Sequence, residues 1–244
     1  MSWGERFVEF WNILNKLIIQ SKTSKWAHLM SLLLHGKDGC GKTAIAAKLL
    51  TQSNVPFIRM ISADSLIGLS EQQKCLRINE IFVDSYKSPL SIIFIDEIER
   101  IIEFSPIGPR FSNTVLQTIL VLIRKVPPTP SSRLLIIMTT AVHDSLNMLI
   151  NNLDTQFSLS VECPELETDE EIVCFLREIT KTNESNTPNT PNTCQLSQSD
   201  CVEIAQCCPK PIGCKRLLLG LELSRNNTDG SIDKEEAMMA LMKL

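Results

Sequence analysis

The sequence predicts an α/β fold, in which a parallel central sheet flanked by helices is followed by a small all-helical domain. Residues 36–43 form the phosphate-binding pattern G-x-x-x-x-G-K-T between an apolar run and a helix-forming run. Other short apolar runs alternate with helical patterns before residue 164, as parallel strands and their crossovers do. From Pro164 the pattern contains helices only. We therefore expect an α/β domain at residues 1–163 and a helical domain at residues 164–244.

Composition and charge narrow the class of protein. The chain has 244 residues, of which 43% are hydrophobic, so a packed core is expected. Its 24 basic and 28 acidic residues give a net charge of −4 without a long basic run, which argues against nucleic-acid partners. No apolar stretch approaches the ~20 residues that span a bilayer. The N-terminus does not resemble a signal peptide, so we expect a cytoplasmic protein without direct membrane insertion.

The nine cysteines are an odd number and include no C-x-x-C pair. We therefore expect reduced thiols rather than a disulfide framework. Four of them gather near the C-terminus, at Cys201, Cys207, Cys208 and Cys214. Their spacing matches no usual zinc pattern and no histidine lies nearby, so zinc is not expected there.

The first helix is predicted from apolar residues that recur with helical spacing and so share one face. They are Phe7, Phe10, Trp11, Leu14, Leu17 and Ile18. We expect this face to pack on the core.

The phosphate-binding pattern lies between a predicted buried strand, Leu29–Leu34, and a predicted helix, Ala44–Gln52. In that context its glycines let backbone N–H groups surround a phosphate, and the positive end of the helix faces the same anion. Lys42 can reach the outer phosphates, and Thr43 can place its hydroxyl on a magnesium ion. A Gly-rich turn before a helix is the alternative, but the strand, the spacing, the lysine and the threonine together favour nucleotide binding.

The next strand is predicted at Pro56–Ile61 and is followed by a loop at residues 65–70. Ser70 and Gln73 have the spacing of a capping box, which predicts a helix from about Glu71 to Ser85.

The third predicted strand, Ile92–Ile95, ends in two carboxylates, Asp96 and Glu97. Ligands of parallel α/β sheets lie beyond the carboxyl ends of the strands, so both residues are expected at the same edge as the phosphate loop. Asp96 suits a magnesium partner, and Glu97 suits a base that orients the attacking water. A helix N-cap pair at a strand end is the alternative, which the upstream phosphate loop disfavours.

Residues 103–113 contain Pro106, Gly108 and Pro109 and are expected to form a loop before a helix at residues 114–125. Two more strands are predicted, at residues 134–138 and 158–161. Thr139 and Thr140 follow the first of these. A hydroxyl of either one can contact a γ-phosphate or the attacking water, and simple strand-end turn residues are the alternative.

In the helical part, Thr168 and Glu171 have the spacing of a capping box. Residues 181–199 are polar and of low complexity, so we expect a surface insertion that cannot bury enough apolar area to become ordered. Helices are expected to resume near Asp200, Gly213 and Asp233.

This order of motifs resembles that of AAA+ ATPases, a class of P-loop NTPases. Four stretches are more specifically similar to the second ATPase domain of the N-ethylmaleimide-sensitive fusion protein family, the vesicle-fusing ATPases. They are KSPLS at 87–91, DEIER at 96–100, PIGPRFSN at 106–113 and IGCKRLL at 212–218. The resemblance extends from Trp3 to about Leu223 and is weaker in the insertion. The PIGPRFSN stretch is its most diagnostic part.

The resemblance implies an ATP- and Mg²⁺-binding module of a cytoplasmic homo-hexamer that helps to disassemble SNARE complexes. In this family the first ATPase domain supplies most of the turnover, whereas the second binds ATP tightly and holds the ring together. We expect this chain to be one domain of a longer protein, which would reach the SNARE complex through an adaptor protein and domains outside this chain.

Site residues follow from the resemblance position by position. Trp3 and Gly4 lie where the family holds adenine. Gly213, with Lys215 or Arg216 after it, matches the lid helix whose cation reaches the γ-phosphate; a solvated basic face is the alternative for that pair. The phosphates would be surrounded by Asp38, Gly39, Cys40, Gly41, Lys42, Thr43, Ala44 and Ile45.

The chain departs from the family in ways that bear on turnover. The family often has Asp-Asp where this chain has Asp96-Glu97, and the polar strand tip is usually Asn rather than threonine. Active rings also need an arginine from the neighbouring subunit, and residues 134–176 contain none. Arg110 and Arg133 are the available substitutes. An arginine finger contributes about 10³-fold or more, so we expect tight ATP binding and slow turnover.

Two functional hypotheses therefore stay open. One is an ATP-dependent oligomerisation module with weak hydrolysis, and the other is a fully active motor that remodels another protein client. The loop at residues 66–69 lacks the aromatic residue of many AAA+ pores, which makes strong substrate gripping doubtful. A nucleic-acid-acting AAA+ protein is a third reading, which the acidic balance disfavours.

Overall fold

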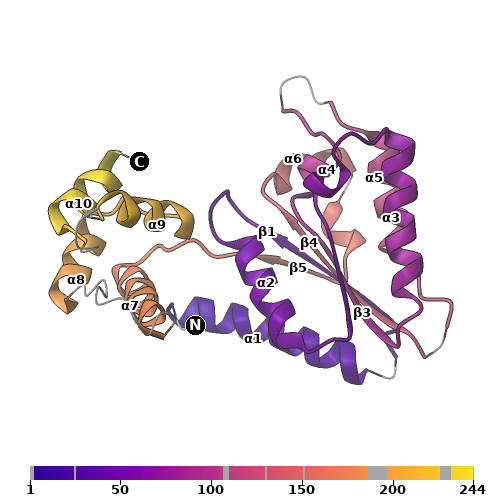
Figure 1. Ribbon diagram of the computed structural model, residues 1–244, viewed down its shortest axis with the longest axis horizontal. Helices are drawn as coiled ribbons and strands as arrows, with labels where there is room; N and C mark the ends of the chain where they lie inside the picture. The colour runs from indigo at the N-terminus through magenta and orange to yellow at the C-terminus, as the bar shows by residue number, and fades with distance from the viewer. Residues whose placement is uncertain are drawn as a thin grey trace. The chain divides into compact units, whose positions relative to one another are not determined.

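The computed structural model describes residues 3–24, 26–106, 110–129, 131–150, 152–185, 197–225 and 232–243 (Figure 1). Its elements, in chain order, are α1 (Glu5–Thr23), β1 (Leu29–His35), α2 (Lys42–Ser53), β2 (Phe57–Ile61), η1 (Ala63–Leu66), α3 (Glu71–Ser85), β3 (Leu90–Ile95), α4 (Ile98–Ile101), α5 (Asn113–Leu122), β4 (Arg133–Thr140), α6 (His143–Ile150), η2 (Leu153–Gln156), β5 (Leu159–Glu162), α7 (Asp169–Ser185), α8 (Gln198–Cys207), α9 (Cys214–Leu223) and α10 (Lys234–Lys243).

The strands form one five-stranded sheet in the order β2-β3-β4-β1-β5, and every neighbouring pair is parallel. The predicted fold class is therefore confirmed. Because all strands run in the same direction, their carboxyl ends meet at one edge of the sheet. That edge carries the phosphate loop after β1, Asp96 after β3 and Thr139 near the end of β4.

Helices cover both faces of the sheet, with α3 and α5 on one side and α2 on the other (Figure 1). Ile93 and Ile136 pack in one core cluster with Phe82 of α3 and Ile119 of α5. The strand residues that alternate with them, such as Ile92, are also inaccessible to solvent. Burial on both faces explains why β3 and β4 are continuous apolar runs rather than alternating ones.

The predicted strands and long helices are present, with shifted ends. Helix α5 ends at Leu122 rather than Lys125, ahead of the buried Pro127. Four short elements were not expected: η1, where a loop was predicted, and α4, α6 and η2. The helical spacing of Leu146, Leu149 and Ile150 was a usable signal for α6.

The capping boxes place the starts of two helices. At α3, Ser70 accepts from the Gln73 backbone N–H and the Gln73 side chain accepts from the Ser70 N–H. At α7, Thr168 and Glu171 exchange the same pair of bonds. Both helices begin where the sequence predicted, because each box satisfies amide groups that have no partner within the helix.

The predicted insertion at residues 181–199 is shorter than expected. Helix α7 continues to Ser185, and α8 begins at Gln198 behind the N-cap Ser197. Residues 186–196 lie outside the described residues, as do residues 107–109 of the PIGPRFSN stretch. Ser105 and Arg110, which precede and follow residues 107–109 in the chain, form an antiparallel bridge.

The chain divides into two compact units. The sheet unit comprises Ile13–Gly36 and Lys42–Cys163, and the helical unit comprises Met1–Asn12, Lys37–Gly41 and Pro164–Leu244. Within the helical unit α7 packs on α8, and α10 packs on α8 and α9. None of the helices among the described residues has the length and apolarity needed to cross a membrane.

Candidate functional site

The phosphate loop has the backbone conformation that its glycines permit. Gly36, Gly39 and Gly41 have φ angles of 145°, 82° and 96°. An L side chain rarely adopts such angles, so the three positions favour glycine. Helix α2 begins at Lys42, directly after the third of them. The loop therefore leads to the N-terminus of a helix, where backbone N–H groups lack partners within the helix.

Lys42 is held at this helix start with only 7% of its surface exposed. Its ammonium group donates a hydrogen bond of 2.8 Å to the carbonyl oxygen of Gly36. That bond turns the side chain back along the loop instead of letting it extend into solvent. A buried ammonium at this position can meet the negative charge of a phosphate.

Asp96 follows β3 and accepts hydrogen bonds from the phosphate loop and from β4. The hydroxyl of Thr43 donates to its Oδ1 atom at 3.0 Å, and the hydroxyl of Thr139 donates to the same atom at 2.7 Å. Asp96 is 8% exposed and Thr139 is fully buried. Sequence analysis placed all three residues near the strand edge, and the structure brings them together around one carboxylate oxygen.

The Asp96–Thr43 pair provides oxygen atoms, which are the donors that Mg²⁺ prefers. Its hydroxyl and carboxylate lie within hydrogen-bond distance of each other at the start of α2. This donor set fits a magnesium ion that accompanies the phosphates of a nucleotide.

Glu97 follows with an unusual backbone. Its φ is 49° and its ψ is 67°, in the left-handed region, and its N–H donates to the Thr139 hydroxyl at 2.8 Å. Its Oε2 atom forms an ion pair of 2.9 Å with Nε of Arg100. The side chains of Glu97 and Arg100 are 36% and 69% exposed. The carboxylate is therefore restrained by a partner that is itself largely in water.

Thr140 differs from Thr139 although the two are adjacent and equally buried. Its hydroxyl accepts a hydrogen bond of 3.2 Å from the N–H of Val142 and so serves the turn that leads to α6. The sequence did not show which of the two threonines has its hydroxyl at the candidate site. The structure places Thr139 at Asp96 and gives Thr140 the role of a strand-end turn residue.

In the helical unit, Gly213 is the N-cap of α9 and lies against Gly39 of the phosphate loop. A Cβ atom on Gly213 would be 3.0 Å from the carbonyl oxygen of Gly39, so a side chain there would be crowded against the backbone of the loop. The N–H of Lys215 donates to that carbonyl at 2.9 Å. Lys215 and Arg216 are both exposed, and it is Lys215 whose backbone contacts the loop.

The other predicted phosphate residues differ in exposure. Cys40 and Ile45 are almost completely buried, whereas Asp38 and Ala44 are exposed. The eight described cysteines are all free thiols.

Trp3 and Gly4, predicted at adenine, have clear packing roles in the helical unit. The Trp3 ring is 9% exposed and lies 4.2 Å from the ring of Phe7 and 4.6 Å from that of Phe175, measured between centroids. Gly4 has a φ of 112°, and a Cβ there would lie 2.7 Å from Cγ of Glu171. Little of the Trp3 ring is thus left to stack on a base.

An ion pair in the helical unit was not found from the sequence. Arg6 donates two hydrogen bonds to the Glu171 carboxylate, at 2.9 and 2.8 Å. Burial alone would raise the pKa of Glu171, but the Arg6 guanidinium and the N–H groups of Glu167 and Thr168 outweigh it and lower that pKa. The partners lie far apart in sequence, so no local pattern indicated the pair.

The two arginines considered as fingers lie in different settings. Arg110 is exposed on the loop that follows α4. Arg133 opens β4, at the amino end of the strand, and donates a hydrogen bond to the carbonyl of Lys22. Of the two, Arg110 has the side chain that is open to solvent.

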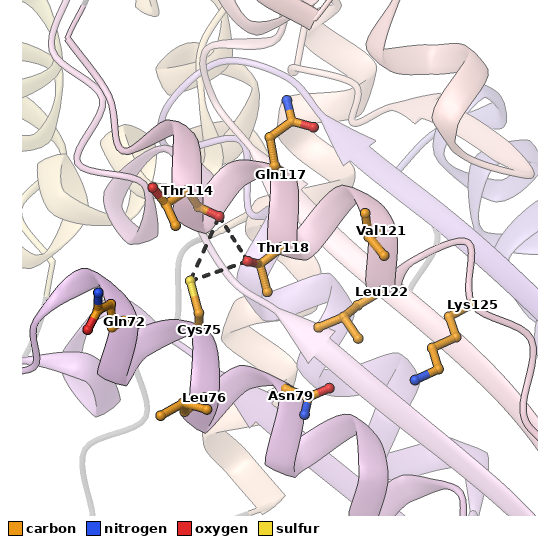
Figure 2. Close-up of a pocket in the computed structure, with 10 residues that line it drawn as sticks. All are labelled: Gln72, Cys75, Leu76, Asn79, Thr114, Gln117, Thr118, Val121, Leu122 and Lys125. Carbon is orange, nitrogen blue, oxygen red and sulfur yellow. Dashed lines mark hydrogen bonds between the residues drawn. The ribbon is translucent and has the colours of Figure 1, made fainter.

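A pocket of about 850 Å³ lies between α3 and α5 (Figure 2). Cys75 lines it, accepting a hydrogen bond from the Thr118 hydroxyl at 3.3 Å and donating one to the carbonyl of Thr114 at 3.8 Å. Of the ten described residues that line it, only Lys125 is charged. The pocket therefore does not have the acid, base and phosphate-binding groups that gather at the strand edge.

Comparison with known proteins gives consistent matches. The family model "ATPase family associated with various cellular activities (AAA)" matches residues 32–164. A vesicle-fusing ATPase of Dictyostelium discoideum is 35% identical over 237 residues, which cover 96% of this chain and 29% of that protein. The vesicular-fusion protein sec18 of Schizosaccharomyces pombe is 44% identical over 158 residues, which cover 64% of this chain and 20% of that protein. The chain thus spans less than a third of the length of these relatives.

Proposed function

This chain belongs to the AAA family of ATPases, and from that premise we propose that it is an ATP-binding module which drives or stabilises the hexamer of a SNARE-disassembling vesicle-fusion ATPase, with slow hydrolysis of its own. The observation that carries the proposal is the convergence of the Thr43 and Thr139 hydroxyls on one oxygen of Asp96. These bonds join the phosphate loop, β3 and β4 into a preorganised site.

Each part of this site has a task in binding. Lys42 neutralises charge on the outer phosphates, and the glycines of the loop present backbone N–H groups to them. Thr43 and Asp96 would hold Mg²⁺, which would neutralise negative charge on the phosphates. Since these groups are already positioned by hydrogen bonds and burial, little conformational freedom is lost when ATP binds.

The setting of Glu97 supports slow hydrolysis. One oxygen of its carboxylate, Oε2, is paired with Arg100 at 2.9 Å, which restrains the side chain that would orient an attacking water. An arginine supplied by a neighbouring subunit is worth about 10³-fold or more in related chemistry, and residues 134–176 supply none. Tight binding combined with a restrained base suits a module that uses ATP to hold subunits together.

The larger assembly is proposed from the relatives. A vesicle-fusing ATPase matches 96% of this chain and a vesicular-fusion protein matches 64% of it, and each relative is more than three times its length. We propose that the chain acts in the cytoplasm as one domain of such a protein, in a homo-hexamer, and that an adaptor protein and other domains bring it to the SNARE complex.

A fully active motor that remodels another client is the second candidate. The observation that favours it is that Glu97 is a carboxylate with a longer reach than aspartate, next to an Asp96 that is already positioned. If Arg100 yields easily, Glu97 is a competent base.

The first experiment measures molar mass by light scattering without nucleotide, with ADP and with ATP. We expect ATP to produce a species of about six chains, because nucleotide is proposed to join the subunits. Lys42→Ala should abolish that species. Lys48→Ala, a lysine change on the same helix, is the matched control and should retain it. A chain that stays monomeric with ATP demonstrably bound would refute the oligomerisation role.

Turnover separates the two candidates. If the chain is an oligomerisation module, the oligomer should release phosphate slowly. If it is a fully active motor, release should be fast and Glu97→Gln should abolish it. Fast release by the wild-type oligomer would therefore replace the first proposal with the second.

A further inference from the structure

Two histidines and an aspartate from separate segments meet beside the last residues of β1. His35 is the final residue of β1, His143 is the first residue of α6, and Asp154 lies in η2. All three belong to the sheet unit. Their ligand atoms lie within 4.8 Å of one another, and all three residues are partly buried. The nucleotide-binding residues described above do not include any of them.

The contacts within this group are specific. Nε2 of His143 is 2.9 Å from Oδ1 of Asp154. The rings of His35 and His143 stack with centroids 4.0 Å apart and an interplanar angle of 18°. We propose that His35, His143 and Asp154 form a binding site for a zinc-class divalent metal ion.

The type of donor selects the metal. Imidazole nitrogens suit Zn²⁺ and related transition metals, whereas Mg²⁺ prefers oxygen and usually keeps several waters. Two histidines, a carboxylate and one water make the four-coordinate set of open zinc sites. Zinc bonds of 2.0–2.1 Å in a tetrahedral arrangement separate ligand atoms by about 3.3 Å. The His143–Asp154 separation of 2.9 Å is close to that value, and the ligand nitrogen of His35 lies within 4.8 Å of both of these atoms.

The surroundings hold these ligands as outer partners do in metal sites. The hydroxyl of Ser160 on β5 donates to Oδ1 of Asp154 at 2.6 Å. Nδ1 of His143 is 3.4 Å from Oδ1 of Asp144, which can keep the ring oriented when the other nitrogen binds metal. Glu162 is the residue opposite His35 in the β1–β5 strand register, and its carboxylate adds negative charge near the group. These groups restrict the ligands before a metal arrives.

The site is also accessible. The side chains of His143 and Asp154 are 17% and 39% exposed, which leaves a solvent-facing position for the fourth ligand. A bound ion would join the end of β1 to the segment between β4 and β5 and so stabilise the sheet unit.

The test is calorimetric titration of the whole chain with ZnCl₂, with a reductant and excess Mg²⁺ present. We expect one zinc ion per chain, and binding at least about 100-fold weaker in His143→Gln, since loss of an outer partner alone costs 10–100-fold. Asp154→Asn is a second variant that keeps side-chain size. His28→Gln is the matched control, because His28 is the third histidine of the chain and lies outside the group. It should bind zinc as the wild type does.

Two further measurements distinguish zinc bound at the proposed site from zinc bound by cysteine thiolates. The visible spectrum of the Co²⁺-substituted chain should lack the thiolate charge-transfer bands that cysteine ligands produce. Zinc should raise the unfolding temperature of the wild type and of His28→Gln but not of His143→Gln. Equal zinc affinity in wild type and His143→Gln, thiolate bands, or no zinc binding would each overturn the proposal and leave the trio as a hydrogen-bonded structural cluster.

Discussion

Thr43, Thr139 and Asp96 form a hydrogen-bonded group, which we call the Asp96 cluster. Thr139→Val tests whether this cluster organises the candidate site. Valine has nearly the same shape as threonine but has no hydroxyl, so the change removes hydrogen bonds without opening a cavity. Two bonds are lost: the one donated to Asp96 at 2.7 Å and the one accepted from the Glu97 N–H at 2.8 Å. The first involves a carboxylate in a buried site, and the second supports the left-handed backbone of Glu97.

The magnitude follows from these two bonds. A hydrogen bond to a charged group contributes about 1.5–3 kcal/mol, and an N–H left without a partner costs about 1–3 kcal/mol. The added methyl group regains up to about 0.8 kcal/mol by burial. We therefore expect the free energy of unfolding to fall by about 2–5 kcal/mol, which for a unit of this size lowers the unfolding temperature by roughly 5–20 °C. ATP affinity should fall as well, because Asp96 loses one of its two positioning partners.

Thr140→Val is the matched control. Thr140 is equally buried on the same strand, but it accepts one bond of 3.2 Å from the Val142 N–H. Its loss should cost about 1 kcal/mol and leave ATP affinity unchanged. Thermal and urea unfolding followed by circular dichroism, with ATP binding by calorimetry, measures both variants. Equal losses of stability and affinity in the two would show that the Asp96 cluster has no special role.

Three further predictions follow from single contacts. Arg100→Gln should raise turnover by roughly 1.4- to fivefold in a phosphate-release assay, since an exposed ion pair restrains Glu97 by about 0.2–1 kcal/mol; unchanged turnover would show that the pair imposes no restraint. Gly4→Ala should lower the unfolding free energy by about 2 kcal/mol or more, because φ is 112° and the new Cβ would meet Glu171; near-wild-type urea stability would refute this. Glu171→Gln should lose stability at neutral pH but little in acid. The folded-state pKa of Glu171 is below its usual 4.5, so its ionised form stabilises the fold above about pH 4.5, and this contribution disappears as the pH falls through the folded-state pKa. A stability difference that does not shrink in acid unfolding curves would contradict it.

Much of the fold could be predicted because its signals are local. Continuous apolar runs marked buried strands such as β3, and capping boxes at Ser70 and Thr168 marked the starts of α3 and α7. The glycines of the phosphate loop indicated where the backbone needs positive φ angles. The short elements α4 and η2 had no such signal, because each is a single turn that is kept helical by packing in the core rather than by its own periodicity.

Sequence alone determined that a phosphate loop, a strand ending in Asp96 and a strand ending in threonines would share one edge, since parallel strands can meet in no other way. Only the tertiary structure decided between Thr139 and Thr140. The β3–β4 register pairs Ile95 with Met138, so Thr139 is the next residue along and faces Asp96, while the strand alternation turns Thr140 away. The Arg6–Glu171 pair and the group of His35, His143 and Asp154 were decided in the same way. Arg6 lies far from Glu171 in the chain, and His35 lies far from His143 and Asp154, so only the packing of the folded segments brings these side chains together.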